Sequence, residues 1–464
     1  MPLVAALLTG VFLIYALRVE RRRNPDVSAA LWIPFCWMFL IGSRYISQWL
    51  NVGIVLDSPD DYLDGSPVDR AVFFLLFAAA LCVLVRRRVS LSAFMAQNVW
   101  LSVFLLYCLL SVTWSDYSFT ALKRWTKVIE HVAMVLVVLS ERNRSQAIDA
   151  LFRRFAYLGL TLSVLFIKYF PDLGRSFSTW TGEGFNGGVT TDKNALGHLC
   201  VLSGVYFIST FVSPRTGGGS AGRAGSRLLD GLMLCFCAWL LSIANAATAL
   251  VCFGLGAGLV VALATPHLTE HPKRLTYYLL AGMLVIAEGQ LLFDLSGAAI
   301  QGLNRDPTLT DRTKVWADVF AMDNNPLVGT GFESFWLGPR AKTLWTKYWW
   351  KPNQAHNGYI ETYINLGLVG LVLLVGTVAA GYAKAQKSLL TDPGYGAVRL
   401  GLLLPILAFN ITDATFKALH VLYFVFFLVV TDLPMRSARE GGESPPAQPG
   451  LEPARRPTAV PSRG

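Results

Sequence analysis

The segment 354–376, QAHNGYIETYINLGLVGLVLLVG, decides the fold class because a polar start runs directly into an apolar stretch of membrane length. Its first half carries His356, Asn357 and Glu361, and from Leu366 onward it holds only apolar residues and glycine. A helix needs about 20 such residues to cross a bilayer. The segment therefore predicts a transmembrane helix that presents a histidine at one membrane surface.

The rest of the chain follows the same pattern. Its 464 residues are 53% hydrophobic and 15% charged, whereas about a quarter of the residues of soluble proteins are charged. We therefore predict an all-α polytopic integral membrane protein with about 12–13 transmembrane helices and one large periplasmic loop before a late helix. The apolar segments are 3–17, 28–42, 69–85, 97–113, 123–139, 155–170, 194–212, 228–245, 246–264, 275–293, 358–381, 399–413 and 417–433.

Basic residues in the loops predict the orientation. Cytoplasmic loops of membrane proteins are enriched in Lys and Arg, and here alternate loops carry basic clusters while the 51–69 loop carries five aspartates. The basic clusters are Arg21–Arg23, Arg86–Arg88, Arg142, Arg144, Arg153, Arg154, Arg215, Arg223, Arg227, Lys273, Arg274, Lys384 and Lys387. The loop before His356 then faces outward, away from the cytoplasm. The predicted parts are a transmembrane bundle (1–293), the large loop (294–357), C-terminal helices (358–433) and a disordered cytoplasmic tail (434–464).

Composition excludes several function classes. The net charge of +10 is spread over many loops, so it does not indicate nucleic-acid binding, which requires basic residues on one face. All seven cysteines lie within apolar segments, which argues against a disulfide framework or a zinc site. We predict neither a metal nor another cofactor.

Basic residues on the outward side are the exception to the loop pattern. Arg124, Arg175, Lys193 and Arg312 lie there, although the topology disfavours positive charge on that side. An anionic ligand would compensate for them, and the planar guanidinium of Arg binds phosphate with two parallel hydrogen bonds. Lipid headgroups and local ion pairs are the alternative partners of any single residue. For the set we predict a site for a diphosphate, with Asn357 as a further contact.

His356 is the predicted catalytic residue. With Gly367 and Gly370 it shares one helical face, so the glycines would let a neighbouring helix pack closely while His356 lies at the outer surface. Asn357 is positioned to cap the helix. A histidine can act as general base near neutral pH, and Arg312 and Arg175 could stabilise a diphosphate leaving group. An interfacial histidine without catalytic function is the alternative.

These motifs resemble the O-antigen ligase and polymerase superfamily. The spacing from His356-Asn357 to Gly367 and Gly370, at the end of the large loop, is similar to the family signature. The resemblance spans about 113–370 and includes three further blocks, WSDYSFTALKRW (114–125), TTDKNALG (190–197) and DRTKVW…NPLVGTGFESF (311–335).

The resemblance implies a metal-independent glycosyltransferase at the periplasmic face. Such enzymes transfer a glycan from an undecaprenyl-diphosphate carrier to a sugar hydroxyl, with inversion. The implied partners are a lipid-linked oligosaccharide donor, a glycan acceptor and membrane lipids, and a chain-length regulator or export component is a further candidate. The family histidine corresponds to His356, and its basic residues correspond to Arg312, Arg175 and Arg124.

The acceptor separates two forms of this activity. Polymerases extend a second lipid-linked unit, whereas ligases use lipid A-core, and the Trp114-Ser115 start favours a polymerase of exopolysaccharide or O-antigen. A transporter of lipid-linked glycans is the alternative from another class, and a scaffold is a third. A transporter would need polar residues along a path at mid-membrane. The charged residues of the spans instead lie near span ends, at Lys168, Glu288, Glu361, Asp413 and Lys417.

Overall fold

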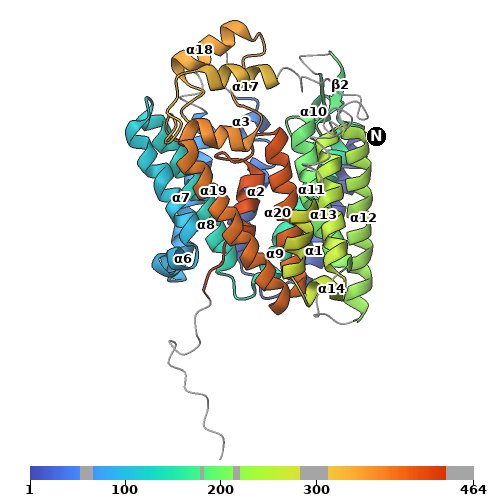
Figure 1. Cartoon of the computed structure of the whole chain (residues 1–464). Coiled ribbons are helices and arrows are strands. Elements are labelled where there is room, and N and C mark those ends of the chain that lie inside the picture. The colour runs from blue at the N-terminus through green and yellow to red at the C-terminus, as the bar shows by residue number, and fades with distance from the viewer. Residues whose placement is uncertain (53–65, 178–181, 213–219, 283–311, 435–464) are drawn as a thin grey trace, which may run out of the picture. The chain divides into compact units, whose positions relative to one another are not determined.

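The computed structural model describes residues 1–52, 66–177, 182–212, 220–282 and 312–434 (Figure 1). Residues Met1–Leu433 form one compact unit. Several predictions fall outside the described residues: most of the aspartate-rich 51–69 loop, the end of the 275–293 span, the start of the large loop, and the tail beyond Pro434.

The described residues fold almost entirely into helices, which confirms the predicted class. Among the described residues, seven helices are long and apolar enough to cross a membrane, or eight if the bent pair of α6 (Leu91–Gln97) and α7 (Val99–Leu110) is one span. The apolar segments are carried by α1 (Pro2–Arg23), α2 (Trp32–Ile41), α5 (Pro67–Arg86), α7 (Val99–Leu110), α8 (Ser118–Leu139), α9 (Arg144–Tyr169), α11 (Lys193–Val212), α12 (Ser220–Ala244), α13 (Ala247–Leu263), α19 (Gly358–Thr391), α20 (Pro393–Thr412) and α21 (Val421–Val430).

Short elements connect these helices. The large loop contributes α17 (Arg312–Ala321) and α18 (Gly338–Lys347). Both lie over one end of the bundle, and α6 and α14 lie at the opposite end (Figure 1). The other short elements are η1 (Ala29–Leu31), α3 (Ile46–Trp49), α6 (Leu91–Gln97), η2 (Ser111–Trp114), α10 (Pro171–Gly174), α14 (Pro266–Thr269), and a hairpin of β1 (Arg175–Phe177) and β2 (Gly184–Asn186).

The core of the bundle surrounds α21. Each of its ten residues is at most 4% exposed, as expected for a helix that is apolar on all sides and packed by others. At the periphery, α1 exposes large apolar side chains such as Leu3 and Leu7. An apolar outer surface suits contact with lipid, so the burial pattern agrees with a membrane protein.

The helix that carries the opening motif is broken at Gly367. This residue has φ 65° and ψ −166°, which lies outside the helical region and favours glycine. The loop 326–331 packs into the break and satisfies the backbone groups that the break exposes. Four backbone hydrogen bonds of 2.9–3.1 Å join the segments, from Leu368 to Pro326, Val369 to Leu327, Thr330 to Ile364 and Gly331 to Asn365.

This break corrects the argument from a continuous helical face. Gly367 faces the loop rather than a neighbouring helix, since a Cβ placed on it would lie 2.2 Å from the carbonyl carbon of Leu327. A Cβ on Gly370 would meet Leu366 of its own helix at 2.2 Å. The two glycines therefore serve the break itself, and the Pro-Leu-x-Gly-x-Gly block 326–331 is its partner.

We predict that Gly367→Leu lowers the free energy of unfolding by more than about 2 kcal/mol, because strained backbone and overpacking each cost about 1–3 kcal/mol. The melting temperature in detergent is the measurement. Gly10→Leu on α1 is the control, since no atom lies within 4 Å of a Cβ at that position. Equal melting temperatures for the two variants would contradict the described packing at the break.

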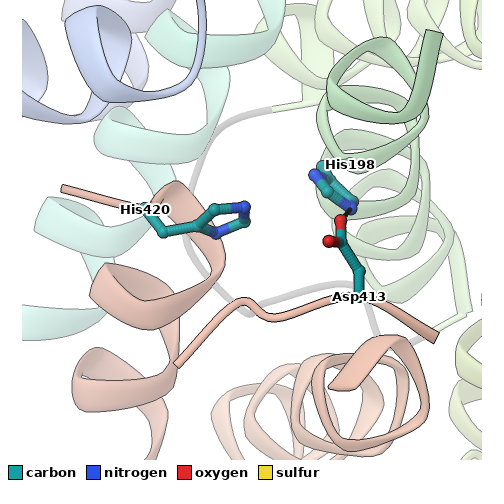
Figure 2. Close-up of side chains that lie close together, drawn as sticks. All are labelled: His198, Asp413 and His420. Carbon is teal, nitrogen blue, oxygen red and sulfur yellow. Dashed lines mark ion pairs between the residues drawn. The ribbon is translucent and has the colours of Figure 1, made fainter. Parts of the chain in front are cut away.

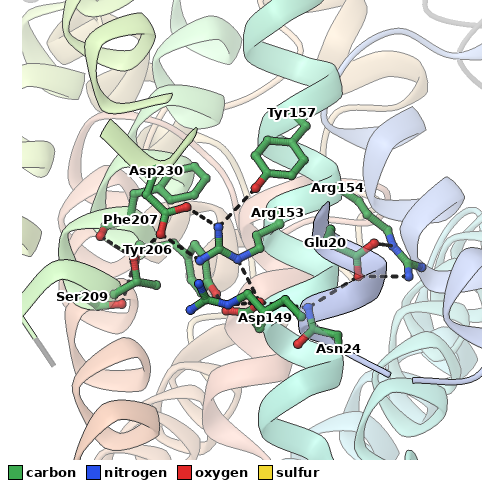
Figure 3. A network of polar contacts seen from close by, with 12 residues as sticks. Glu20, Asn24, Asp149, Arg153, Arg154, Tyr157, Tyr206, Phe207, Ser209 and Asp230 are labelled. Carbon is green, nitrogen blue, oxygen red and sulfur yellow. Dashed lines mark hydrogen bonds and ion pairs between the residues drawn. The ribbon is translucent and has the colours of Figure 1, made fainter. Parts of the chain in front are cut away.

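A buried ionic network joins α1, α9 and α12 (Figure 3). Arg153 and Arg154, predicted to lie in a loop, are instead at most 1% exposed within α9. Arg153 contacts Asp149 at 2.8 Å and Asp230 of α12 at 3.0 Å. Arg154 bonds Glu20 of α1 at 3.1 Å. Buried charges require such partners, so the network fixes α1 and α12 against α9.

Candidate functional site

His356 lies in the turn directly before α19, with a left-handed backbone (φ 49°). The following Asn357 is the N-cap that the sequence predicted: its side chain accepts from the amides of Tyr359 and Ile360 at 2.9 and 3.0 Å. Its amide group also donates to Ile411 at the end of α20, at 3.0 Å. These contacts fix the turn against α20, and the predicted diphosphate contact of Asn357 stays a prediction.

A buried carboxylate holds the same turn from the other side. Glu361, in the first turn of α19, accepts from the indole of Trp336 at 2.7 Å and from the backbone amide of Ala355 at 2.9 Å. Glu361 is only 9% exposed. The residue before His356 is thus tied to α19, which orients the imidazole.

Asp413 is the centre of the site. It follows the last residue of α20, and its two carboxylate oxygens face different histidines. One oxygen lies 3.8 Å from Nδ1 of His356 and the other lies 3.7 Å from Nε2 of His198 on α11. Figure 2 shows His198 and Asp413 facing each other, with His420 pointing toward them. His420 caps α21, and its ring centroid is 5.3 Å from that of His198.

His198 has an unused polar atom. Its side chain is 3% exposed, and Nε2 has no hydrogen-bond partner among the described residues. The distance of 3.7 Å to Asp413 is too long for a hydrogen bond. Nε2 is therefore available to a ligand or a water molecule between the two groups.

The charges around Asp413 set the protonation states. Burial alone raises the pKa of the Asp413 carboxyl, but the facing histidines outweigh it and hold the pKa well below its usual range. Burial lowers the pKa of His356, and the nearby Arg312 and Lys417 add to this effect, while Asp413 opposes it. At neutral pH Asp413 is ionised and His356 is neutral, which is the form that a general base requires.

Arg312 joins this cluster from the large loop. It is the first residue of α17 and donates a short hydrogen bond to the carbonyl of Thr412, next to Asp413. Burial lowers its pKa, and Asp413 acts in the opposite direction. A cavity of about 60 Å³ lies beside the two residues. Its lining is Asn194, His198, Ala246, Thr248, Ala249, Arg312, Phe409, Thr412 and Asp413.

The other predicted basic residues have different positions. Arg124 pairs with Glu333, 4.0 Å away, and Glu333 in turn accepts from the amide of Ala418 in the loop that carries Asp413. Arg175 donates to the carbonyl of Ile167 at 2.8 and 3.1 Å. Lys193 begins α11, next to the cavity residue Asn194. The structure thus brings His356 and Arg312 to one cluster and joins Arg124 to the adjoining loop.

Sequence reasoning missed several members of the cluster. Gln354 lies 3.3 Å from Nδ1 of His356 and accepts from Lys417 at 2.9 Å. Asp413 and Lys417 were noted only as charges at span ends, and His198 and His420 were not noted. An ionisable residue at the outer end of a span is a functional signal, and applying it to the last two spans identifies Asp413 and Lys417.

Three of these residues could also ligate a metal. The ligand atoms of His198, Asp413 and His420 all lie within 4.8 Å of one another. Imidazole and carboxylate suit a first-row transition metal. The positive charges of Arg312 and Lys417 act on this site, and they oppose binding of a dication. The charge balance favours an anionic ligand.

Two comparisons with known proteins relate this chain to a family of membrane proteins. Residues 229–375 match the O-antigen ligase family model, a range that includes Arg312, His356 and the break at Gly367. The chain is also 27% identical over 313 residues to the exopolysaccharide production protein ExoQ of Rhizobium meliloti (strain 1021). That match covers 64% of this chain and 67% of the relative. These two matches confirm the resemblance drawn from the sequence motifs and support membership of the chain in the O-antigen ligase and polymerase superfamily.

Proposed function

We propose that the protein transfers a glycan from an undecaprenyl-diphosphate carrier to a sugar hydroxyl during surface polysaccharide assembly. The family match and the exopolysaccharide relative support the coarser role of a membrane O-antigen ligase or polysaccharide polymerase. The observation that carries the finer proposal is the cluster of His356 and Arg312 around Asp413, beside a cavity. It combines a neutral imidazole with a guanidinium suited to a diphosphate.

The proposed reaction is a single displacement. The imidazole of His356 removes the proton of the acceptor hydroxyl, and the oxygen attacks the anomeric carbon of the donor glycan. The bond between that carbon and the diphosphate oxygen breaks, and undecaprenyl diphosphate leaves with the electron pair. Arg312 stabilises the charge that develops on the leaving diphosphate. Attack from the face opposite the leaving group inverts the configuration at the anomeric carbon.

Asp413 is a positioning residue in this scheme. Its carboxylate, 3.8 Å from His356, favours the imidazolium that forms when the base takes its proton. It also compensates the positive charge of Arg312 before substrate binds. Burial of the site strengthens both interactions.

We propose that the site faces the periplasm, and the distribution of basic residues supports this orientation. The end of the bundle that holds the site also carries α17 and α18. The basic clusters Arg21–Arg23 and Arg86–Arg88 lie at the C-terminal ends of α1 and α5, at the other end of the bundle. The positive-inside rule assigns the basic side to the cytoplasm. The large loop 294–357 and the donor would then share the outer leaflet of the inner membrane.

The acceptor is tested by supplying one acceptor at a time. Purified protein receives a lipid-diphosphate oligosaccharide alone, or together with lipid A-core, and the products are resolved on a gel. We expect chain extension with the lipid-linked oligosaccharide alone, in keeping with the exopolysaccharide relative. Transfer only to lipid A-core would identify a ligase. Inertness in both reactions would contradict the proposal and favour a transporter of lipid-linked glycans.

The pH profile tests the pairing of Asp413 with His356. Because only neutral His356 acts as base, the maximal rate should fall as the pH falls through the lowered pKa of His356. Asp413 raises that pKa, so Asp413→Asn should move the acid limb to lower pH and reduce the plateau rate at least about tenfold, a typical scale for lost electrostatic support. The control is Asp323→Asn, an exposed carboxylate in the loop after α17. An acid limb that stays at the wild-type pH would contradict the coupling.

Metal dependence gives a further prediction. The proposed chemistry uses only protein side chains, so transfer should proceed at the full rate after dialysis against EDTA, with metal content verified by elemental analysis. Loss of activity that Mn²⁺ or Mg²⁺ restores would contradict this expectation. The trio of His198, Asp413 and His420 would then be the first metal site to examine.

A further inference from the structure

A second cavity lies far from His356, where α7 meets α19. Its volume is about 160 Å³, and its polar lining residues are Gln97, Asn98, Thr377 and Lys384, together with the indole of Trp100. Lys384 lies 17 residues beyond the break at Gly367 (384 − 367), a helical rise of about 26 Å at 1.5 Å per residue. A hydrocarbon core is about 30 Å thick. The cavity therefore lies near the headgroup level of the leaflet opposite the site.

The cavity forms at a sharp break in the chain. Helices α6 and α7 are bent by 108° at Asn98, which is 2% exposed. The side-chain oxygen of Asn98 accepts from the ammonium of Lys384 at 2.6 Å, and its amide group donates to the carbonyl of Asp432 at 2.8 Å. The lysine is thus held in the cavity by a neutral amide, which positions its charge without neutralising it.

The cavity lining holds one charged residue, Lys384, and no carboxylate. Asp432 pairs with Arg399 at 2.9 Å. The same carboxylate acts on Lys384 and on Arg144. One carboxylate thus serves three cations, of which Arg399 is almost completely buried. A bound anion would balance the remainder.

Apolar residues complete the site. Val99, Leu101 and Val430 line the cavity beside the polar pair. Trp100 is 46% exposed, and tryptophan is typical of the boundary between headgroups and acyl chains. The cavity therefore combines a positioned cation with an apolar wall.

We propose that this cavity binds an anionic phospholipid of the cytoplasmic leaflet. Its phosphate would contact Lys384, and its first acyl carbons would lie against Trp100 and the apolar wall. Basic pockets between transmembrane helices on the cytoplasmic side recognise anionic headgroups by this combination. The site shares no residue with the His356 cluster, so the proposal is independent of glycan transfer.

Thermal unfolding of the full chain in detergent tests the proposal. The probes are phosphatidylglycerol, phosphatidylcholine with the same acyl chains, and inorganic phosphate. Binding to the folded state raises the melting temperature. We expect phosphatidylglycerol to raise it by a few degrees, and phosphatidylcholine and phosphate to have little effect. An equal shift with phosphatidylcholine would overturn the anionic specificity, and a full shift with phosphate would overturn the lipid assignment.

Variants then locate the site. Lys384→Met should lose the phosphatidylglycerol shift, Lys384→Arg should keep it, and Lys387→Met, an exposed neighbour on α19, is the matched control that should also keep it. Ala380→Leu fills the cavity while leaving Lys384 in place, so it should lose the shift even if Lys384→Met folds poorly. A wild-type response in Ala380→Leu or Lys384→Met would overturn the proposed location.

Discussion

Replacement of His356 by alanine is expected to reduce glycan transfer by at least about a hundredfold, since general base catalysis contributes about 10²–10⁴ in rate. The imidazole is neutral because burial lowers its pKa, and Asp413 lies 3.8 Å away to stabilise its protonated form. Transfer by the purified variant is compared with wild type at saturating donor and acceptor. The fold should survive, because Asn357 and Glu361 hold the turn independently of the imidazole.

A control variant and a measurement of stability show whether the loss is specific to the imidazole of His356. His271→Ala, an exposed histidine at the opposite end of the bundle, should transfer glycan at the wild-type rate. The melting temperature of His356→Ala should stay close to that of wild type. Wild-type turnover by His356→Ala would eliminate the general-base role, whereas a collapse of the melting temperature would identify a structural histidine.

Arg312→Lys is expected to lower the maximal rate tenfold or more, equivalent to about 1.4 kcal/mol of transition-state stabilisation. Lysine keeps the charge but loses the planar fork that binds a diphosphate with two hydrogen bonds. It also loses the guanidinium contact to the carbonyl of Thr412 that holds Arg312 beside the cavity. The measurement is the transfer rate as a function of lipid-diphosphate concentration.

The form of the loss distinguishes two roles of Arg312. A fall in maximal rate indicates action on the leaving group, and a rise in half-saturating concentration alone indicates ground-state binding. Arg340→Lys is the control, because Arg340 makes an exposed ion pair with Asp116, a class that contributes about 0–1 kcal/mol. Unchanged rate and saturation in Arg312→Lys would remove it from the site and leave Arg175 and Lys193 as candidates.

The fold class could be predicted because it depends on local sequence. The long described helices fall on the predicted apolar segments, and α12 and α13 are separated near Asn245, where two of those segments meet. Hydropathy suffices there, since each span must satisfy its own backbone inside the bilayer. The cap at Asn357 is likewise local and was predicted.

The break at Gly367 could not be predicted in this way. A helical wheel assumes a continuous helix, and the partner of the break, loop 326–331, lies some 40 residues earlier in the chain. Backbone hydrogen bonds between segments so far apart leave no periodic pattern in the sequence. The burial of Arg153 and Arg154 could not be predicted for the same reason, because their partners Glu20 and Asp230 are on other helices.

The site itself was predicted only in part. His356 and Arg312 were predicted from their residue types and from the resemblance of the surrounding motifs to the family signature. Asp413 and His198 lie in separate spans, and only the tertiary packing of α11 and α20 brings their side chains within 3.7 Å. A sequence pattern indicates which residues have ionisable or reactive side chains, whereas the packing of the helices determines which of these side chains lie close together.

The stoichiometry of carrier release tests the proposed glycan transfer most directly. Protein in lipid nanodiscs is supplied with a radiolabelled undecaprenyl-diphosphate oligosaccharide, and both the freed carrier and the lengthened glycan are quantified over time. We expect one undecaprenyl diphosphate to be released for each glycan transferred, with both products reduced at least about a hundredfold in His356→Ala. Intact donor after prolonged incubation with folded wild-type protein, or carrier release at the wild-type rate by His356→Ala, would contradict the proposed transfer.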